Sequence, residues 1–507
     1  MQTVFTDKKE SKNLPYQVFT TEQVKSLEAI YAQGHNGHCY DLMERAGKRV
    51  FSEILRLNKK PSMVWIFCGR GNNGGDGYIV ASLLKEQGIT HRVFAMGIPH
   101  TNTEANLAFE YYLSLGGNIE FDLPENFTVP PEITVDAILG TGIKSAPKED
   151  AAEWILFVND LGGFKISIDI PSGVIANTGM VPGNCINADL TVCMLGLKPG
   201  LFTSDAVDYT GKVVFDSLNV STDHFYNQIS HQEIPLRRLG YEDIIANLPK
   251  RVTSSNKGDS GKVLLIAGSL GMGGAALISG IGALRAGAGL VKIATDLHNV
   301  SAINSCRPEL MTINIFDEEA LVQAINWADV IAVGPGLGQG LEVSQILENL
   351  NGVRKPVIVD ADALNLISKG LDLYLERMVI TPHPGEAARL LGTSASEINA
   401  DRINAACRLY ERYGSTVLLK GAGTIVYDGK PITIISEGSP AMATGGMGDL
   451  LTGMIASLCA QGLSLSQATC VAAVIHGRAG SMASKEAGVI GTLPLDLAPY
   501  IRLLVNG

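Results

Sequence analysis

Near the C-terminus, the run Thr444-Gly-Gly-Met-Gly-Asp449 stands directly before an apolar, helix-like segment, residues 450–460. Glycines at the start of a helix expose backbone amides toward an anion, and the helix dipole adds to the attraction. Asp449 cannot itself bind phosphate, but it is well placed to take a proton from a hydroxyl. Phosphoryl transfer requires both features. A helix cap with a flexible entry is the alternative interpretation, because aspartate is an ordinary first-turn residue.

Four further motifs in the second half follow expected strands. Lys420-Gly-Ala-Gly-Thr424 can wrap the phosphates of a nucleotide, with the lysine adding positive charge. Gly334-Pro-Gly-Leu-Gly338 is by itself more typical of a tight loop. His383 lies between two prolines, in a rigid loop that would present it to a ligand. Asp360-Ala-Asp-Ala-Leu-Asn365 is consistent with magnesium binding or water positioning, and equally with loop capping.

The first half contains a glycine-rich segment, Gly69-Arg-Gly-Asn-Asn-Gly-Gly-Asp-Gly77, between an expected strand and a helix-like stretch at residues 78–87. Such glycines let the backbone approach a ligand, and amides at a helix N-terminus favour phosphate. Gly69, Gly71 and Gly74 formally match GxGxxG, but the acidic residue expected about 20 positions later for a ribose is missing. A conventional dinucleotide fold and a bare structural turn therefore stay open as alternatives.

Two more strand ends in the first half carry polar side chains. Asp136 opens the sequence Asp-Ala-Ile-Leu-Gly-Thr-Gly, and Asp169 and Ser172 belong to Asp-Ile-Pro-Ser-Gly. Because ligands collect at the carboxyl ends of strands in an open parallel sheet, we expect these side chains to share a crevice with Asn73 and Asp76. Grouped oxygen atoms suit a hard cation, and a carboxylate there could act as general acid or base. Either aspartate alone could instead cap a loop or a helix.

Apolar runs divide the chain into two α/β halves. In the first half they predict buried parallel strands at residues 63–68, 91–96, 135–139 and 164–170. Before them, apolar residues at three-to-four spacing between Leu27 and Leu55 predict helices that pack on this sheet. In the second half the predicted strands are residues 263–267, 291–294, 330–333, 357–359, 378–380 and 417–419, with helices such as 275–286 and 450–460 between them. Residues 217–249 are mixed and polar, so we divide the chain there, into domains 1–225 and 226–507.

The length of 507 residues is too great for one ordinary hydrophobic core, which agrees with two domains. No apolar run is long enough to cross a bilayer, and the polar N-terminus lacks the apolar segment of a secretory signal. We therefore expect a cytoplasmic protein without a membrane partner. The formal net charge of -11 argues against nonspecific nucleic-acid binding. The eight cysteines lack CxxC spacing and predict reduced, mostly packed thiols.

The motifs of the first half resemble the NAD(P)H-hydrate epimerases over about residues 23–219. That resemblance implies a Rossmann-like three-layer αβα fold and a potassium site at Asn73, Asp136 and Ser172. The implied reaction interconverts the R and S forms at the hydrated carbon of the nicotinamide ring, and Asp169, together with Asp76, is the candidate acid. The residues that would contact the hydrated cofactor are Asn72, Asn73, Gly74, Gly75, Asp76, Gly140, Thr141, Gly142 and Asp169.

The motifs of the second half, together with Lys257-Gly-Asp-Ser-Gly-Lys262, resemble the ADP-dependent NAD(P)H-hydrate dehydratases over about residues 239–505. That resemblance implies a ribokinase-like αβα fold. ADP would phosphorylate the hydroxyl of the S hydrate, with Asp449 as base and magnesium as cofactor, and loss of phosphate would give NAD(P)H, AMP and phosphate. The nucleotide would be held by Lys420, Gly421, Ala422, Gly423, Thr424 and Gly448. The hydrate would contact Ala276, Gly336, His383 and Asp449.

Two rival interpretations stay open. A ribokinase-like kinase of a small-molecule hydroxyl fits the glycine-rich run before Asp449 equally well, although the His383 loop and the whole first half speak against it. A nucleotide-sensing module would bind cofactors without turnover, but it would have no use for the acids Asp169 and Asp449. No Walker A sequence is present, since residues 258–262 lack its spacing. ADP rather than ATP rests on the prokaryotic branch of the family, and we expect a homo-oligomer with hydrated NADH and NADPH as substrates.

Overall fold

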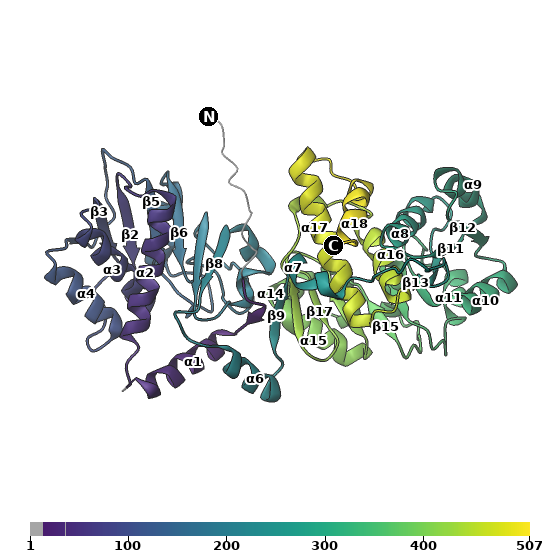
Figure 1. The fold of residues 1–507 in the computed structure, drawn as a ribbon, viewed down its shortest axis with the longest axis horizontal. Helices are drawn as coiled ribbons and strands as arrows, with labels where there is room; N and C mark the ends of the chain where they lie inside the picture. Colours follow the sequence, from purple (N-terminus) through teal and green to yellow (C-terminus); the bar gives the residue numbers. More distant parts are fainter. Residues whose placement is uncertain (1–13, 36) are drawn as a thin grey trace. The chain divides into compact units, whose positions relative to one another are not determined.

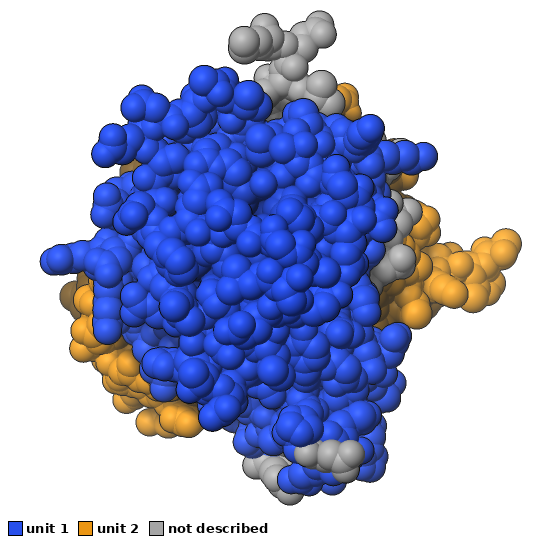
Figure 2. Space-filling view, turned by 90° about the vertical axis from the view of Figure 1, so that its left-hand side faces the viewer, with its two compact units in different colours: residues 1–236 blue, residues 237–507 orange. Residues whose placement is uncertain are grey.

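The first unit of the chain includes helix α6 (Asp223–Gln232) and ends shortly after it. The computed structural model describes residues 14–35 and 37–507 and divides the chain into residues 1–236 and 237–507 (Figure 2). The division lies after Leu236 rather than after residue 225, because α6 packs Phe225 and Tyr226 against Phe19. A stretch that is polar in the sequence thus carries a helix that completes the first unit.

The first unit is built on a seven-stranded sheet in the order β4-β3-β2-β5-β6-β7-β8, with every neighbouring pair parallel. Side chains alternate along a strand, so Ile66 of β2 faces one core and its neighbour Phe67 faces the other. Burial on both faces explains the continuous apolar runs of the sequence. The strands are β2 (Val64–Cys68), β3 (His91–Ala95), β4 (Ile119–Glu120), β5 (Ile133–Ala137), β6 (Phe164–Ile168), β7 (Leu190–Met194) and β8 (Lys212–Asp216).

Helices cover both faces of this sheet (Figure 1). The core on one face contains residues of α2 (Tyr40–Leu57), α3 (Asn72–Glu86) and α4 (Glu104–Ser114), and the core on the other contains residues of α5 (Glu149–Asp160). The chain runs from β2 outward to β3 and β4, then returns to β5 on the other side of β2. Such a reversal leaves a crevice at the carboxyl ends of the two central strands. The N-terminal elements are β1 (Gln17–Val18) and α1 (Thr21–Gly34).

The sheet of the second unit has the order β9-β18-β17-β16-β15-β14-β13-β10-β11-β12. Strands from β16 to β12 are parallel, whereas β16, β17 and β18 pair antiparallel. Its strand order reverses between β10 and β13, which again creates a crevice at the strand ends. The strands are β9 (Leu236–Leu239), β10 (Lys262–Ile266), β11 (Leu290–Thr295), β12 (Met311–Asn314), β13 (Val330–Val333), β14 (Val357–Val359), β15 (Met378–Ile380), β16 (Thr416–Leu419), β17 (Ile425–Tyr427) and β18 (Ile432–Ile435).

Three helices form one layer of the second unit, α8 (Gly273–Arg285), α16 (Met447–Ala460) and α17 (Leu465–Ala487). Glycines allow α8 and α16 to touch, because a Cβ on Gly453 would stand 1.9 Å from the carbonyl oxygen of Ser279. The remaining helices are α7 (Tyr241–Ile244), α9 (Leu297–Cys306), α10 (Glu318–Trp327), α11 (Leu341–Glu348), α12 (Ala361–Ser368), α13 (Pro384–Leu391), α14 (Ala395–Ala400), α15 (Arg402–Tyr413) and α18 (Ala498–Leu504). Of the helices in residues 14–35 and 37–507, none combines the length and apolar character of a membrane span.

The expected pair of α/β units is confirmed, with two local differences. Strand β5 ends at Ala137 rather than at residue 139, because the Asp136 carboxylate accepts a hydrogen bond from the Ile138 amide and turns the chain. Helix α3 begins at Asn72 rather than Tyr78, so the glycine-rich segment forms the first turns of the helix instead of a loop. Strands β4, β7, β8, β12, β17 and β18 were not among the predicted ones.

Two candidate active sites

A cavity of about 960 Å³ opens in the first unit at the carboxyl ends of β2, β5 and β6. Two of the predicted contacts, Gly74 and Gly75, do not line it. A Cβ on Gly74 would stand 2.0 Å from the carbonyl oxygen of Gly69, and one on Gly75 would stand 2.6 Å from Met43 Cε. These glycines therefore serve the close packing of α3. The predicted residues that do line the cavity are Asn72, Asn73, Asp76, Gly140, Thr141, Gly142 and Asp169.

Asp136 is fully buried behind the wall of this cavity. Its carboxylate accepts hydrogen bonds from the Ser172 hydroxyl at 2.5 Å, the Ser172 amide at 2.9 Å and the Ser167 hydroxyl at 2.8 Å. Burial raises the pKa of Asp136, and these hydrogen bonds offset part of that effect. Within the described chain, no lysine or arginine pairs with this carboxylate. A buried carboxylate held only by neutral donors favours a bound cation nearby.

The backbone of Leu139 links Asn73 to Ser172, which itself binds Asp136. The Asn73 Nδ2 donates to the Leu139 carbonyl at 3.0 Å, and the Leu139 amide donates to Ser172 Oγ at 2.8 Å. The three predicted potassium ligands thus lie in one cluster. Amide, hydroxyl, carboxylate and carbonyl oxygens are the atoms that hard cations prefer, so the donor set fits such an ion.

Asp169 follows β6 and adopts a left-handed backbone conformation with φ 65°, which is uncommon for a residue other than glycine. Its Oδ1 accepts a hydrogen bond from the Met194 amide at 3.1 Å and forms an ion pair with Lys198. The Asp169 side chain is 21% exposed, while Lys198 is 1% exposed. Both residues line the cavity, and the Asp169 carboxylate is the more exposed of the two. Burial by itself would lower the pKa of Lys198, but the Asp169 charge outweighs it and the pKa is raised.

Two more carboxyl groups line the same cavity, Asp76 from α3 and Glu28 from α1. Burial raises the pKa of Asp76 well above its ordinary value, and the negative charge of Asp169 adds to the shift. Burial also raises the pKa of Glu28, although Lys198 opposes that shift. Analysis of the sequence missed both Glu28 and Lys198. The sequence feature that could have pointed to Lys198 is a lysine in an apolar run directly after a strand.

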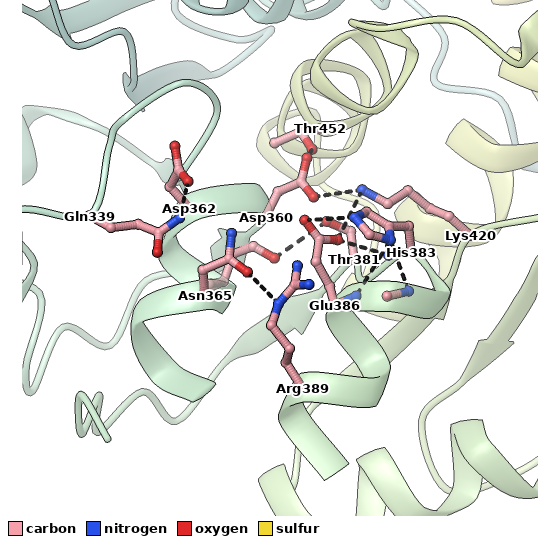
Figure 3. Close-up of polar contacts among 12 residues, drawn as sticks. Gln339, Asp360, Asp362, Asn365, Thr381, His383, Glu386, Arg389, Lys420 and Thr452 are labelled. Carbon is pink, nitrogen blue, oxygen red and sulfur yellow. Dashed lines mark hydrogen bonds and ion pairs between the residues drawn. The ribbon is translucent and has the colours of Figure 1, made fainter. Parts of the chain in front are cut away.

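In the second unit, Lys420 and Asp360 form an ion pair at the ends of β16 and β14 (Figure 3). The distance from Lys420 Nζ to Asp360 Oδ1 is 2.8 Å, and Thr452 of α16 donates to Asp360 Oδ2 at 2.7 Å. Lys420 is 20% exposed, whereas Asp360 is 1% exposed. Burial would raise the pKa of Asp360, but Lys420 and the hydroxyls outweigh it and the pKa is lowered. The sequence placed each residue at a strand end without predicting this pair.

His383 and Glu386 form a capping box at the start of α13. The His383 Nδ1 accepts a hydrogen bond from the Gly385 amide at 3.0 Å, and the Glu386 carboxylate accepts one from the His383 amide at 2.8 Å. The ring is half exposed, and its Nε2 lies 3.6 Å from Glu386 Oε1. Glu386 also lies 3.8 Å from Lys420 Nζ, which ties the His383 loop to the lysine (Figure 3).

Asp449 lies in the first turn of α16. This helix begins directly after Gly446, which has φ 89°. A Cβ on Gly448 would stand 3.1 Å from Lys420 Nζ, so the glycine admits the ammonium to the N-terminus of the helix. Burial raises the pKa of Asp449 to about 7, with Asp360 adding to the shift and Lys420 opposing it. A carboxyl group with this pKa can both accept and release a proton near neutral pH.

Loops after β10 and β13 bring the remaining predicted residues toward this end of the sheet. Gly336 has φ 56°, and a Cβ there would stand 2.9 Å from Ala275 Cβ, so this loop packs closely on the start of α8. Ala276 has no exposed surface, whereas its neighbour Ala275 is partly exposed. Asp362 accepts hydrogen bonds from the Gly338 amide and the Gln339 side chain, each at 2.9 Å, and so fixes the loop (Figure 3).

Arg402 of α15 supports the expected nucleotide loop, residues 420–424, through hydrogen bonds to the backbone. This buried guanidinium donates to the carbonyl oxygens of Leu419 at 3.2 Å and Lys420 at 3.1 Å. Burial lowers the pKa of Arg402 to about 10. A Cβ on Gly421 would stand 2.7 Å from the Arg402 guanidinium, so glycine is needed there. Arg402 and Thr452 are two further residues of this site that the sequence did not reveal.

Comparisons with known proteins give a match for each half of the chain. Residues 263–503 match the family model described as NAD(P)H-hydrate dehydratase, and residues 39–200 match the one described as YjeF-related protein N-terminus. The bifunctional NAD(P)H-hydrate repair enzyme Nnr of Escherichia coli (strain K12) is 40% identical over 99% of this chain and 97% of its own length.

Solved structures are similar to the second unit. A ribokinase-like superfamily protein from Enterococcus faecalis V583 is 29% identical, with a TM-score of 0.50 over 54% of this chain and 95% of that one. The ADP/ATP-dependent NAD(P)H-hydrate dehydratase from Bacillus subtilis, co-crystallised with ATP and Mg²⁺, is 31% identical over 52% of this chain and 95% of that one, with a TM-score of 0.47. The chain belongs to the family of bifunctional NAD(P)H-hydrate repair enzymes, which join an epimerase to a ribokinase-like dehydratase.

Proposed function

We propose that the first unit epimerises hydrated NADH and NADPH at the cavity floor beside Asp169. A protonated carboxyl group helps the ring hydroxyl leave as water while the ring nitrogen supplies electrons, and water then adds to the other face and gives a proton to a carboxylate. Asp76, whose pKa is raised, suits the first role, and Asp169, paired with Lys198, suits the second. The opposite environments of these two acids in one cavity support this assignment.

A potassium ion would bind at Asn73, Asp136 and Ser172. The support is the cluster of oxygen atoms around a buried carboxylate that has no cationic partner within the described chain. When bound, the ion supplies fixed positive charge near the strand ends, where the phosphates of a dinucleotide collect. The cluster shares Leu139 with the cavity wall, so the ion would also fix the loop that carries Gly140 and Thr141.

The second unit would dehydrate the S hydrate by phosphoryl transfer from ADP. Asp449 takes the proton of the hydrate hydroxyl, whose oxygen attacks the terminal phosphorus, and AMP leaves. Phosphate then departs with a ring proton and restores the double bond of NAD(P)H. Lys420 and the amides at the start of α16 stabilise the moving charge. The single observation that carries this proposal is the position of Asp449, whose pKa is about 7. Asp449 lies in the same helix turn as Gly448, where the missing side chain leaves room for the Lys420 ammonium.

Magnesium would reach this site together with the nucleotide. Among the described residues, no group of three histidine, cysteine or acidic side chains is placed to hold a metal alone. Asp362 and Asp360 already accept hydrogen bonds on both carboxylate oxygens. Mg²⁺ commonly uses water and the phosphates of its substrate as ligands, so the ion would be held mainly by the nucleotide phosphates and by water.

Incubation of the full chain with mixed R and S hydrates of NADH tests the proposal. The recovery of dihydronicotinamide absorbance is followed with ADP, ATP or no nucleotide. We expect complete recovery with ADP, because epimerisation feeds the R form into the dehydratase. No recovery with either nucleotide would reject the repair function, and recovery with ATP alone would reject the choice of ADP.

A further inference from the structure

Lys198 is a charged side chain of the first unit that the proposed reaction does not yet use. It follows β7 in the sequence Gly-Leu-Lys-Pro-Gly and is 1% exposed. Its ammonium donates to Asp169 Oδ1, to the Met194 carbonyl at 3.0 Å and to the Cys193 sulfur at 3.7 Å. Transfer of an ammonium group from water to such a place is unfavourable unless a charged partner compensates. Asp169 is the one carboxylate that forms an ion pair with it in the described chain.

The contacts of Asp169 are unequal for its two oxygens. Both the Lys198 ammonium and the Met194 amide bind Oδ1. In residues 14–35 and 37–507 no hydrogen bond to Oδ2 is present, and the side chain reaches the cavity surface. One oxygen is thus held from behind while the other is left for the substrate. The left-handed backbone at Asp169 adds to this fixed orientation, because it is kept only where the surroundings enforce it.

Several charged groups surround Asp169. Asp76 of α3 and Glu28 of α1 both act on it with negative charge. Carboxylates in a confined space repel one another, and a cation in direct contact offsets that repulsion. The titratable groups around the cluster are Glu28, Lys25, Glu104, Asp76, Cys193 and Lys198. Of these, Lys198 supplies the positive charge in direct contact with Asp169.

We propose that Lys198 is a positioning residue of the epimerase site, which holds Asp169 by its Oδ1 and turns its Oδ2 toward the substrate ring. This inference rests on the proposed epimerisation. Lys198 acts through Asp169 and exchanges no proton with the substrate, since its three donor contacts are all to the protein. The proton that leaves the incoming water goes to Asp169 Oδ2, and Asp76 supplies the proton for the departing hydroxyl.

The test compares initial rates of R-to-S conversion in the full chain for wild type, Lys198→Met and Lys198→Arg. We expect Lys198→Met to lower kcat about a hundredfold with little change in KM, because the carboxylate is a catalytic group and the lysine does not touch the substrate. Lys198→Arg, which keeps the charge, should restore part of the rate.

A control for the loss of a lysine is Lys165→Met, at the other end of β6, where Nζ donates to the Leu161 carbonyl. It should epimerise like wild type, and S-hydrate dehydration should be unchanged in every variant. If Lys198→Met does not fold, Lys198→Gln keeps a donor without the charge and should also lower kcat with little change in KM. An unchanged rate in Lys198→Met, or a loss that appears as a raised KM at an unchanged kcat, overturns the inference. Absence of epimerisation in wild type would instead reject the proposed function.

Discussion

Both units place a buried aspartate–lysine pair at the carboxyl ends of parallel strands, but the two pairs face opposite ways. In the first unit, Asp169 is 21% exposed and Lys198 1% exposed. In the second, Lys420 is 20% exposed and Asp360 1% exposed. The first site therefore presents a carboxylate to its ligand, and the second presents an ammonium.

This difference shows how one structural device can serve two chemistries. Epimerisation requires proton transfer, which an exposed carboxylate performs, whereas phosphoryl transfer requires positive charge beside moving oxygens, which an exposed ammonium supplies. In each pair the buried partner balances the charge of the more exposed one. In the second site the proposed base is a separate residue, Asp449, whose pKa of about 7 reflects burial near Asp360. In the first site the proposed base belongs to the pair itself.

The largest expected effect follows from Asp449→Asn. Removal of a general base lowers the rate by about a hundredfold to ten-thousandfold, so dehydration of the S hydrate should fall at least a hundredfold. Epimerisation should stay at the wild-type rate, because Asp449 lies in the second unit. Separate assays of the two reactions measure this, and substantial dehydration by Asp449→Asn would contradict the assignment of the base.

A smaller effect is expected from Asp360→Asn, which removes the hidden partner of Lys420. The lysine would keep only the Glu386 contact at 3.8 Å, so it would be less well held beside Gly448. We expect dehydration to slow by about tenfold or more, and unfolding of the second unit to become easier by about 3 kcal/mol, the usual result of breaking a buried pair. Thr452→Val is the milder companion, because it removes one hydrogen bond to the same carboxylate.

The smallest expected effect is a shift in the pH dependence of the dehydration rate. Asp449 acts as a base only when ionised, so dehydration should rise with pH and level off above a midpoint of about 7. The negative charge of Asp362 helps to raise the pKa of Asp449, so Asp362→Asn should move the midpoint to lower pH. Rate profiles of both proteins with saturating nucleotide measure the shift. A profile that is flat around neutrality, or a midpoint that moves upward, would contradict this account.

Much of this structure could be predicted from the sequence because strand ends are marked by glycine and acidic residues. Asp136, Asp169, Asp360 and Lys420 were all placed at such ends, and their order along the chain agreed with two α/β units. The pairings could not be predicted, since Asp360 and Lys420 are 60 residues apart and meet only through sheet order.

Other parts of the sites had only a weak sequence signal. Lys198 stands in an apolar run without a motif, and Glu28 lies on a helix that looks like any amphipathic segment. Gly74 and Gly75 were predicted to contact the ligand, and the structure shows that both pack closely against neighbouring residues. Glycine serves close helix packing as readily as ligand contact. A glycine in the sequence indicates that the backbone lies close to another group, and the structure identifies that group as a ligand or as a neighbouring residue.

The most direct test of two separate sites in one chain is the progress curve of Asp169→Ala with mixed R and S hydrates and excess ADP. Our account predicts a fast phase that ends when the S hydrate is consumed, near half of the total in an equal mixture, followed only by slow spontaneous epimerisation. Wild type should show a single phase to completion. A single complete phase at the wild-type rate in Asp169→Ala would contradict the role of the first unit.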